Sequence, residues 1–299
     1  MRLFGSGGDK QQDQAAQDRQ EASRLSIEQG GLPLNAIDRL QEQASRRGTP
    51  GHLFTSDLSV NELSLVHHAG YEVLGQVMGS SVYHVGWQLV LQSGQSGEMD
   101  VITRAYYEAR HRAFGRLQQE AALLGATGVV GVRLERKEYA WGESMIEFAA
   151  LGTAIREKDV SPQPKADKPF LSDLSGQDFW VLRQAGFRPV GFAFGNCTYY
   201  ETGQAWTIES QNWGMDNFER RSYTQAVYTA RSLAMQRMEA EARAVSATGI
   251  VGADIKIEAE KVDDKGYGVV FHFTATGTTI APFVGRWPIF SVLNVVPLK

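Results

Sequence analysis

Cysteine, dense positive charge and long apolar runs are scarce in this 299-residue sequence, and each scarcity excludes a class of function. The only cysteine is Cys197, which excludes an internal disulfide and favours a reducing cytoplasm. No apolar run approaches the roughly 18 residues of a membrane helix, and the first residues lack a signal-peptide core. Lys and Arg number 30 against 34 Asp and Glu, without a basic stripe. We therefore expect a cytoplasmic protein with no membrane span and no nucleic-acid partner.

Catalytic motifs are scarce as well. The sequence has no nucleophile elbow, Walker loop, His-Glu-x-x-His or dinucleotide-binding glycine turn. Gly75-x-x-x-Gly79 and Gly191-x-x-x-Gly195 follow predicted strands but lack the helix start and lysine of a phosphate cradle. These glycines instead indicate backbone that approaches a neighbour closely or has positive φ. We therefore expect that the protein is not an enzyme and has no cofactor.

What the sequence does contain is an internal repeat. The block from Gly70 to Gly75 returns 116 positions later, from Gly186 to Gly191. Ala-Thr-Gly-Val-Val-Gly at 126–131 returns 121 positions later as Ala-Thr-Gly-Ile-Val-Gly, and a third block returns at an offset of 125. Two short insertions explain the growing offset, so the chain consists of two copies of one module.

Each copy begins with a short helix and a strand. Ser59 and Ser175 carry N-cap signals for the short helices, and Gly70 and Gly186 end them. Strands are expected at about 71–78 and 187–194. The glycine-, serine- and aromatic-containing residues that follow are expected to be irregular.

A long helix follows in each copy. Apolar residues recur every three or four positions, the spacing of one buried helical stripe. The first stripe comprises Ile102, Ala105, Ala109, Ala113, Leu117, Ala121 and Leu124. The second comprises Tyr223, Ala226, Ala230, Ala234, Met238, Ala242 and Val245. Four alanines at equivalent places predict a helix that packs closely on its own sheet.

Two further strands complete each copy. Alternating apolar residues directly after the long helix predict the first of them, and the final strands are expected at 145–156 and 268–280. The fold class is therefore α+β: two tandem modules, each a strand–helix–strand–strand unit with the long helix packed on an antiparallel sheet, preceded by a short capping helix. The predicted divisions are a disordered or peripheral helical arm at 1–52, modules at 53–157 and 169–283, a linker at 158–168 and a C-terminal extension at 284–299.

The long helix followed by Leu124-Gly125-Ala126 and Val129-Val130-Gly131-Val132-Arg133, closing with Leu151-Gly152-Thr153-Ala154, resembles the YbjQ family. These small bacterial proteins carry a heavy-metal-binding label. The resemblance is good over about 70–156 and weaker over 186–281, which implies a tandem duplication of the family domain. It further implies a fold similar to the dodecin subunit and assembly into five-fold rings. The family's Gly-Gly-Arg-Ser-like segment before the long helix lacks its arginine in both copies, so a ligand role of that segment does not transfer.

The residues that could bind a metal do not recur between the two copies. None of the six histidines is matched by a histidine in the other copy, and Cys197 corresponds to Ser81. A duplicated metal site is therefore not expected, since such metals need clusters of Cys and His. A single-copy site using His84 or Cys197, or a site completed by assembly, stays open.

Polar and aromatic residues that both copies keep are candidates for a ligand site or an interface. These are Tyr83 with Tyr199, Arg110 with Arg231, and Asp100 with Asp216. Arg116 and Glu120 are four residues apart on the helix and are expected to form a surface ion pair. Aromatic residues beside an irregular segment line interfaces or apolar pockets.

Charges reverse between the copies on one predicted strand. Arg133 corresponds to Asp254 and Glu135 to Lys256, and all four are expected to point away from the buried residues Val132, Leu134, Ala253 and Ile255. Such a reversal favours contact between unlike modules. The expected function is a ring-forming assembly or ligand-binding protein with an unknown small ligand; the alternative is heavy-metal binding. Among the assemblies we favour a homopentamer of two stacked rings over a ring of alternating modules.

Overall fold

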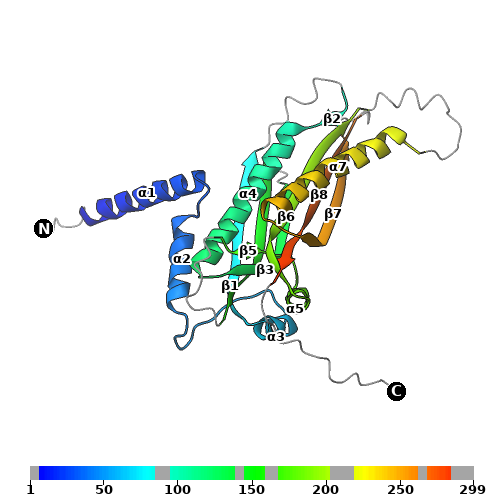
Figure 1. The fold of residues 1–299 in the computed structure, drawn as a ribbon. Coiled ribbons are helices and arrows are strands. Elements are labelled where there is room, and N and C mark those ends of the chain that lie inside the picture. The colour runs from blue at the N-terminus through cyan, green and yellow to red at the C-terminus, as the bar shows by residue number, and fades with distance from the viewer. Residues whose placement is uncertain are drawn as a thin grey trace, which may run out of the picture.

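The computed structural model describes residues 7–84, 95–138, 145–158, 168–202, 219–261 and 268–283 (Figure 1). Most of the predicted linker and all of the predicted C-terminal extension lie outside these ranges.

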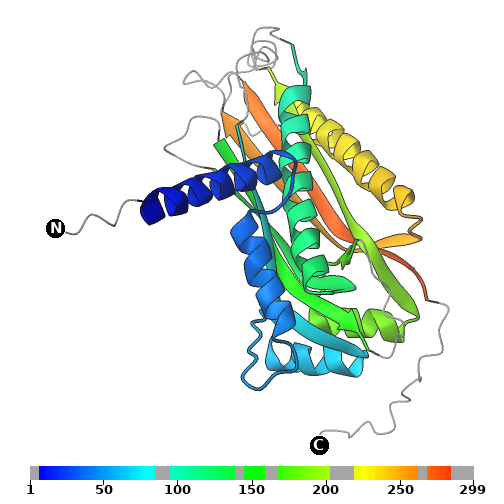
Figure 2. The same ribbon diagram turned by 90° about the vertical axis from the view of Figure 1, so that its left-hand side faces the viewer.

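The N-terminal arm is helical. Helix α1 (Gly7–Glu28) extends away from the body, whereas α2 (Leu34–Ser45) lies along the body beside α4 (Figure 2). Leu40 of α2 is fully buried, and Arg47 donates a hydrogen bond to the carbonyl of Leu124. The body therefore holds α2 by an apolar contact and by polar contacts beside it.

Both modules have the predicted order of elements. The first contains α3 (Val60–His68), β1 (Tyr71–His84), α4 (Asp100–Leu123), β3 (Gly128–Glu138) and β4 (Met145–Glu157). The second contains α5 (Gly176–Gln184), β6 (Phe187–Glu201), α7 (Arg221–Ala244), β7 (Gly249–Lys261) and β8 (Val269–Pro282). The capping helices α3 and α5 lie side by side (Figure 1). Fold class and module pattern are thus confirmed.

The first strand of each module is longer than predicted. Residues 79–84 continue β1 by pairing with β4, and residues 195–201 continue β6 by pairing with β8. Their Gly and Ser content suggested irregular backbone. Antiparallel pairing along the whole strand overrides that weak local preference.

Each sheet also takes a short strand from the other module. The orders are β1-β4-β3-β5 and β2-β6-β8-β7. Strand β2 (Gly97–Glu98) leads into α4 but pairs with β6. Strand β5 (Phe170–Leu171) leads into the second module but pairs in parallel with β3. The two modules are therefore joined by hydrogen-bonded backbone as well as by side chains.

The long helices approach their sheets very closely. A Cβ atom on Gly79 would lie 2.1 Å from the carbonyl oxygen of Ala113, and one on Gly195 would lie 1.9 Å from that of Ala234. Both alanines are fully buried. The predicted roles of the two glycines as close-approach positions, and of the alanine stripe as the packed face, are confirmed.

The body consists of four layers: the first sheet, α4, the second sheet and α7 (Figure 1). Alternation along β6 produces this order. Ala193 and Cys197 pack with the α7 core, whereas Phe192 and Phe194 meet aromatic residues of α4. Helix α4 therefore lies between the two sheets, and α7 covers the far face of the second.

One core prediction is wrong. Ala253 and Ile255 were expected to be buried, but β7 is exposed along most of its length and Ile255 is 43 % accessible. Val132, which corresponds to Ala253 in the first module, is buried. Its N–H donates to the carbonyl of Ser172, in the segment after β5, at 2.9 Å. Strand β7 has no such covering segment among the described residues.

Candidate functional site

The contact between the two modules is the best-built polar site among the described residues. One side consists of β2 and α4. The other side consists of the backbone edge of β6 that faces α4, together with the neighbouring side of α7. We call this the inter-module contact.

An ion pair with a buried arginine lies at its centre. Arg110 of α4 donates to both carboxylate oxygens of Glu241 of α7, at 2.6 and 3.3 Å. Glu241 also accepts the backbone N–H of Phe194 at 2.9 Å. The Arg110 guanidinium lies 4.4 Å from the centre of the Phe194 ring, a cation–π distance. The predicted candidate Arg110 is thus an interface residue with both its charge and its flat face engaged.

The hydroxyls of α4 bind the free edge of β6. Tyr107 donates to the carbonyl of Phe194 and accepts the N–H of Asn196, both at 3.3 Å. Thr103 accepts the N–H of Thr198 at 3.1 Å. Edge backbone groups that would otherwise be buried without partners are therefore satisfied.

A second ion pair closes the end nearest β2. Arg237 of α7 donates to the two oxygens of Glu98 at 2.6 and 2.8 Å, and to the carbonyl of Asn196 at 2.9 Å. Burial alone raises the pKa of Glu98, but hydrogen bonds and the positive charge of Arg237 outweigh it and lower that pKa. Glu98 therefore stays ionised.

Aromatic residues fill the remaining contact. Phe114 and Phe192 meet edge to face at 5.1 Å, and Tyr106 stacks on His272 of β8 at 5.6 Å. Burial, assisted by the charge of Arg136, lowers the pKa of His272 to about 4. His272 is therefore neutral at pH 7.

The second module carries an unused copy of the α4 side. Helices α4 and α7 each have 24 residues and begin 121 positions apart, at Asp100 and Arg221. The contact residues Glu98, Thr103, Tyr107 and Arg110 therefore correspond to Glu219, Thr224, Tyr228 and Arg231, and every residue type is kept. Tyr228 is 61 % accessible and Arg231 is exposed. We call these four residues of the second module the donor face.

The first module carries an unused copy of the β6 side. Glu120 accepts the N–H of Met78 at 2.9 Å, as Glu241 does from Phe194. Arg116 donates to the carbonyl of Ser80 at 2.6 Å, as Arg237 does to Asn196. We call Met78, Ser80, Val82, Arg116 and Glu120 the acceptor face.

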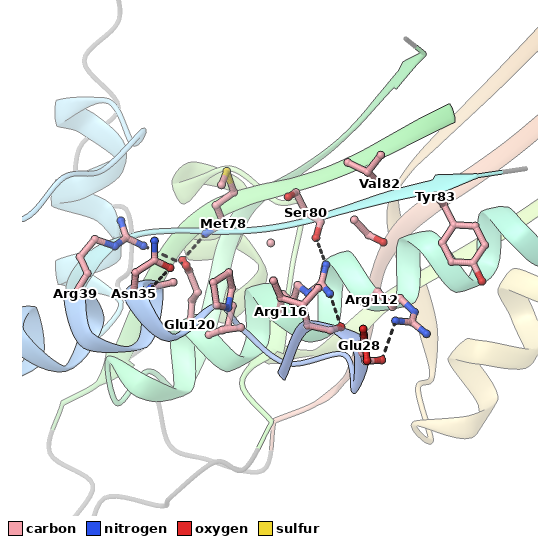
Figure 3. Close-up of a pocket in the computed structure, with 16 residues that line it drawn as sticks. Glu28, Asn35, Arg39, Met78, Ser80, Val82, Tyr83, Arg112, Arg116 and Glu120 are labelled. Carbon is pink, nitrogen blue, oxygen red and sulfur yellow. Dashed lines mark hydrogen bonds and ion pairs between the residues drawn. The ribbon is translucent and has the colours of Figure 1, made fainter. Parts of the chain in front are cut away.

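Residues of the acceptor face on β1 are more exposed than their counterparts on β6. Met78 is 48 % accessible where its counterpart Phe194 is 1 % accessible. Val82 is 49 % accessible where Thr198 is 1 % accessible. A groove of about 830 Å³ lies between the acceptor face and the N-terminal arm, lined in part by Tyr83 (Figure 3).

The predicted candidates divide among these surfaces. Tyr199 pairs with Glu98 where β2 meets β6, Tyr83 lines the groove, and Arg231 belongs to the donor face. Asp100 is the exposed first residue of α4, and Asp216 lies outside the described residues.

The predicted ion pair between Arg116 and Glu120 does not form. Arg116 turns to the carbonyl of Ser80, and Glu120 turns to the N–H of Met78. The edge of β1 offers both residues a buried backbone partner, which outweighs a surface pair of a few tenths of a kcal/mol. Tyr107 and Glu98 were not predicted, although their identity with Tyr228 and Glu219 at the offset of 121 is a signal that could have revealed them.

The metal candidates do not come together. His84 lies on β1 and pairs with Met145, whereas Cys197 lies in the other sheet and pairs with Phe273. Burial and the nearby Glu98 carboxylate raise the pKa of Cys197 to about 12, which disfavours the thiolate that metals bind. Within the described ranges, no group of three or more His, Cys, Asp or Glu could hold a metal ion.

Comparison with known proteins agrees with the duplicated architecture. The YbjQ family, described as "Putative heavy-metal-binding", matches residues 55–158 and 215–281. The chain belongs to the YbjQ family. This YbjQ protein is 42 % identical over 238 residues to an encapsulin nanocompartment protein of Mycobacterium tuberculosis, covering 77 % of this chain and 89 % of that protein.

Shorter relatives match a single module. A UPF0145 protein of Thermoplasma acidophilum is 35 % identical over 94 residues, which are 30 % of this chain and 77 % of that protein. One from Clostridium perfringens is 37 % identical over 93 residues, which are 30 % of this chain and 86 % of that protein. In the part of the chain that the structure describes, no helix has the length and apolar character to cross a membrane.

Proposed function

We propose that this YbjQ protein is a non-catalytic assembly protein whose chains join head to tail by repeating the inter-module contact. The observation that carries the proposal is the pair of unused faces. The donor face and the acceptor face lie on one chain, and each reproduces half of a contact that the same chain already makes.

The symmetry of the inter-module contact supports chain growth. A two-fold contact would also place Tyr228 and Arg231 against Met78 and Ser80. Tyr228 and Met78 are instead both exposed, so the contact is heterologous. Heterologous contacts generate rings when the rotation closes and open filaments when it does not.

Each polar group has a complementary partner for the proposed contact between chains. Arg231 of one chain pairs with Glu120 of the next, as Arg110 pairs with Glu241. Glu219 pairs with Arg116, as Glu98 pairs with Arg237. The hydroxyl of Tyr228 reaches the backbone of β1 as that of Tyr107 reaches β6. Both proposed ion pairs therefore join opposite charges.

The arrangement bears on stoichiometry. Stacked five-module rings, the basis of the expected homopentamer, would place the two modules of a chain in different rings. Head-to-tail packing within the chain instead supports the alternating ring, in which successive modules of one ring come from the same chain. The number of chains then depends on the rotation between modules.

The nanocompartment relative extends the proposal. That protein's name connects it with an encapsulin compartment, and the similarity spans both modules. We propose that this chain likewise assembles as a component of such a compartment. Heavy-metal binding, which the family description suggests, has less support because His84 and Cys197 lie in different sheets.

Light scattering of the full chain tests the assembly. We expect a mass that is an integer multiple of 33.0 kDa. Arg231→Glu should dissociate the assembly, because it places a carboxylate opposite Glu120 of the next chain. A single 33.0 kDa species of the unmodified chain at micromolar concentration would sink the proposal.

A further inference from the structure

The acceptor face already has partners within its own chain. The side chain of Arg39, on α2, donates to one oxygen of Glu120 at 3.1 Å, while the other oxygen accepts the N–H of Met78 (Figure 3). Glu241 divides its oxygens in a similar way, with its main bond to Arg110 on one oxygen and the strand N–H on the other. Arg39 thus occupies the place of the arginine that a docking module would supply.

The end of α1 and the turn after it do the same at Arg116. Arg116 donates to the carbonyls of Ile27 and Gly31, both at 3.0 Å, in addition to that of Ser80. Its counterpart Arg237 donates to the carboxylate of Glu98 instead. Two neutral carbonyls therefore stand in for one carboxylate.

These contacts are weaker than the ones they imitate. The Arg39 side chain is 63 % accessible, whereas the Arg110 side chain is 5 % accessible, although Glu120 itself is buried. Water screens the charge of an exposed arginine, and bonds between two ions are stronger than bonds from an ion to a neutral carbonyl. The groove between the arm and the acceptor face also shows that the arm fills this surface incompletely.

We propose that α1, α2 and the turn between them form an intramolecular cap on the acceptor face, which a second chain displaces when its Arg231 replaces Arg39 at Glu120. The occupant of the uncapped face is a second copy of this chain, because the donor face repeats the residues that bind the equivalent surface of the second module. This inference rests on the proposed function and assigns its regulation. Capping keeps chains apart at low concentration.

The test is Arg39→Ala in the full chain, with Arg46→Ala as the matched control. Arg46 lies immediately after the same helix and pairs with Glu42 rather than with the acceptor face. Sedimentation over a range of concentrations measures the dissociation constant between chains. Because the exposed Arg39 competes with the Arg231 of a docking chain for Glu120, Arg39→Ala should lower that constant about two- to fivefold. Arg46→Ala should leave it unchanged.

The outcomes separate the two proposals. A raised or unchanged dissociation constant for Arg39→Ala overturns the cap and leaves the assembly standing. Monomers of every variant at micromolar concentration overturn both. Hydrogen exchange gives a second readout: amides of residues 34–45 should exchange faster in the assembled protein than in the monomer, and equal protection overturns displacement.

Discussion

Glu120 and Glu241 accept a strand N–H at the same distance, 2.9 Å, from Met78 and Phe194, yet only Glu241 also binds an arginine of another module. The two glutamates show that one local structure is built twice, once in the contact between modules and once beneath the N-terminal arm. The two copies can therefore be compared directly.

Arg110→Ala should lower the free energy of unfolding by about 2–4 kcal/mol, because it removes a buried guanidinium and leaves Glu241 without its cationic partner. Urea denaturation at concentrations that give a single 33.0 kDa species would measure this. Arg231→Ala is the matched control at the equivalent exposed position, and it should change stability by less than about 0.5 kcal/mol. Equal effects of the two substitutions would contradict the assignment of the buried contact.

Gly195→Ala should strongly destabilise the second module. Its new methyl group would lie 1.9 Å from the Ala234 carbonyl oxygen, so α7 must move off the sheet. Gly115 in α4 is the control, since a Cβ there meets nothing within 4 Å. Gly115→Ala should raise stability by about 0.5–1 kcal/mol through helix propensity. The melting temperatures of both variants test this, and an unchanged melting temperature for Gly195→Ala would contradict the close contact.

Ala230→Leu tests the buried helix stripe. Ala230 is fully buried against the second sheet, and the added methylenes should overpack that contact at a cost of about 1–3 kcal/mol. An unchanged melting temperature would mean that the α7 stripe does not bear on the sheet as described.

Stability should fall in mild acid because of His272. Its pKa is about 4 in the folded chain, below its ordinary 6.5. The unfolded chain therefore binds a proton first, and stability that is complete above pH 6.5 is lost as the pH falls toward 4, by roughly 2–3 kcal/mol at most. Denaturation of His272→Gln should show a shallower pH dependence between these limits.

The thiol of Cys197 should react slowly while the protein is folded. Burial raises its pKa to about 12, and the residue is enclosed beneath α7. Labelling with a chromogenic disulfide should be slow in buffer and fast in denaturant.

Mass spectrometry of untagged protein should find less than about a tenth of an equivalent of any transition metal, and stoichiometric zinc would contradict this prediction.

The sequence predicted the fold well because local patterns determine most of it. The capping box at Ser59 forms as expected, with Glu62 reaching back to the serine N–H. The alanine stripes and close-approach glycines pack as their spacing indicates. The repeat also supplied a second example of each element, which made the order of strands and helices secure.

The site was harder to predict because it depends on how modules meet. The four-residue spacing of Arg116 and Glu120 suggests a helical ion pair, but the edge of β1 offers each a better partner. Ile255 has the pattern of a core residue, yet its burial requires a covering segment that β7 does not have among the described residues. Periodicity describes one element and its own face, whereas both outcomes depend on neighbours from elsewhere in the chain.

The exchanged strands β2 and β5 give the fusion of two modules in one chain a structural consequence. Each module completes the other's sheet, so every second contact in an alternating assembly forms within one molecule. Tethered partners meet at effective concentrations that reach the millimolar range, far above those of free subunits in dilute solution. A ring built from such chains needs half as many bimolecular steps as a ring of single modules. Dilution should therefore yield intact two-module chains, never separated modules.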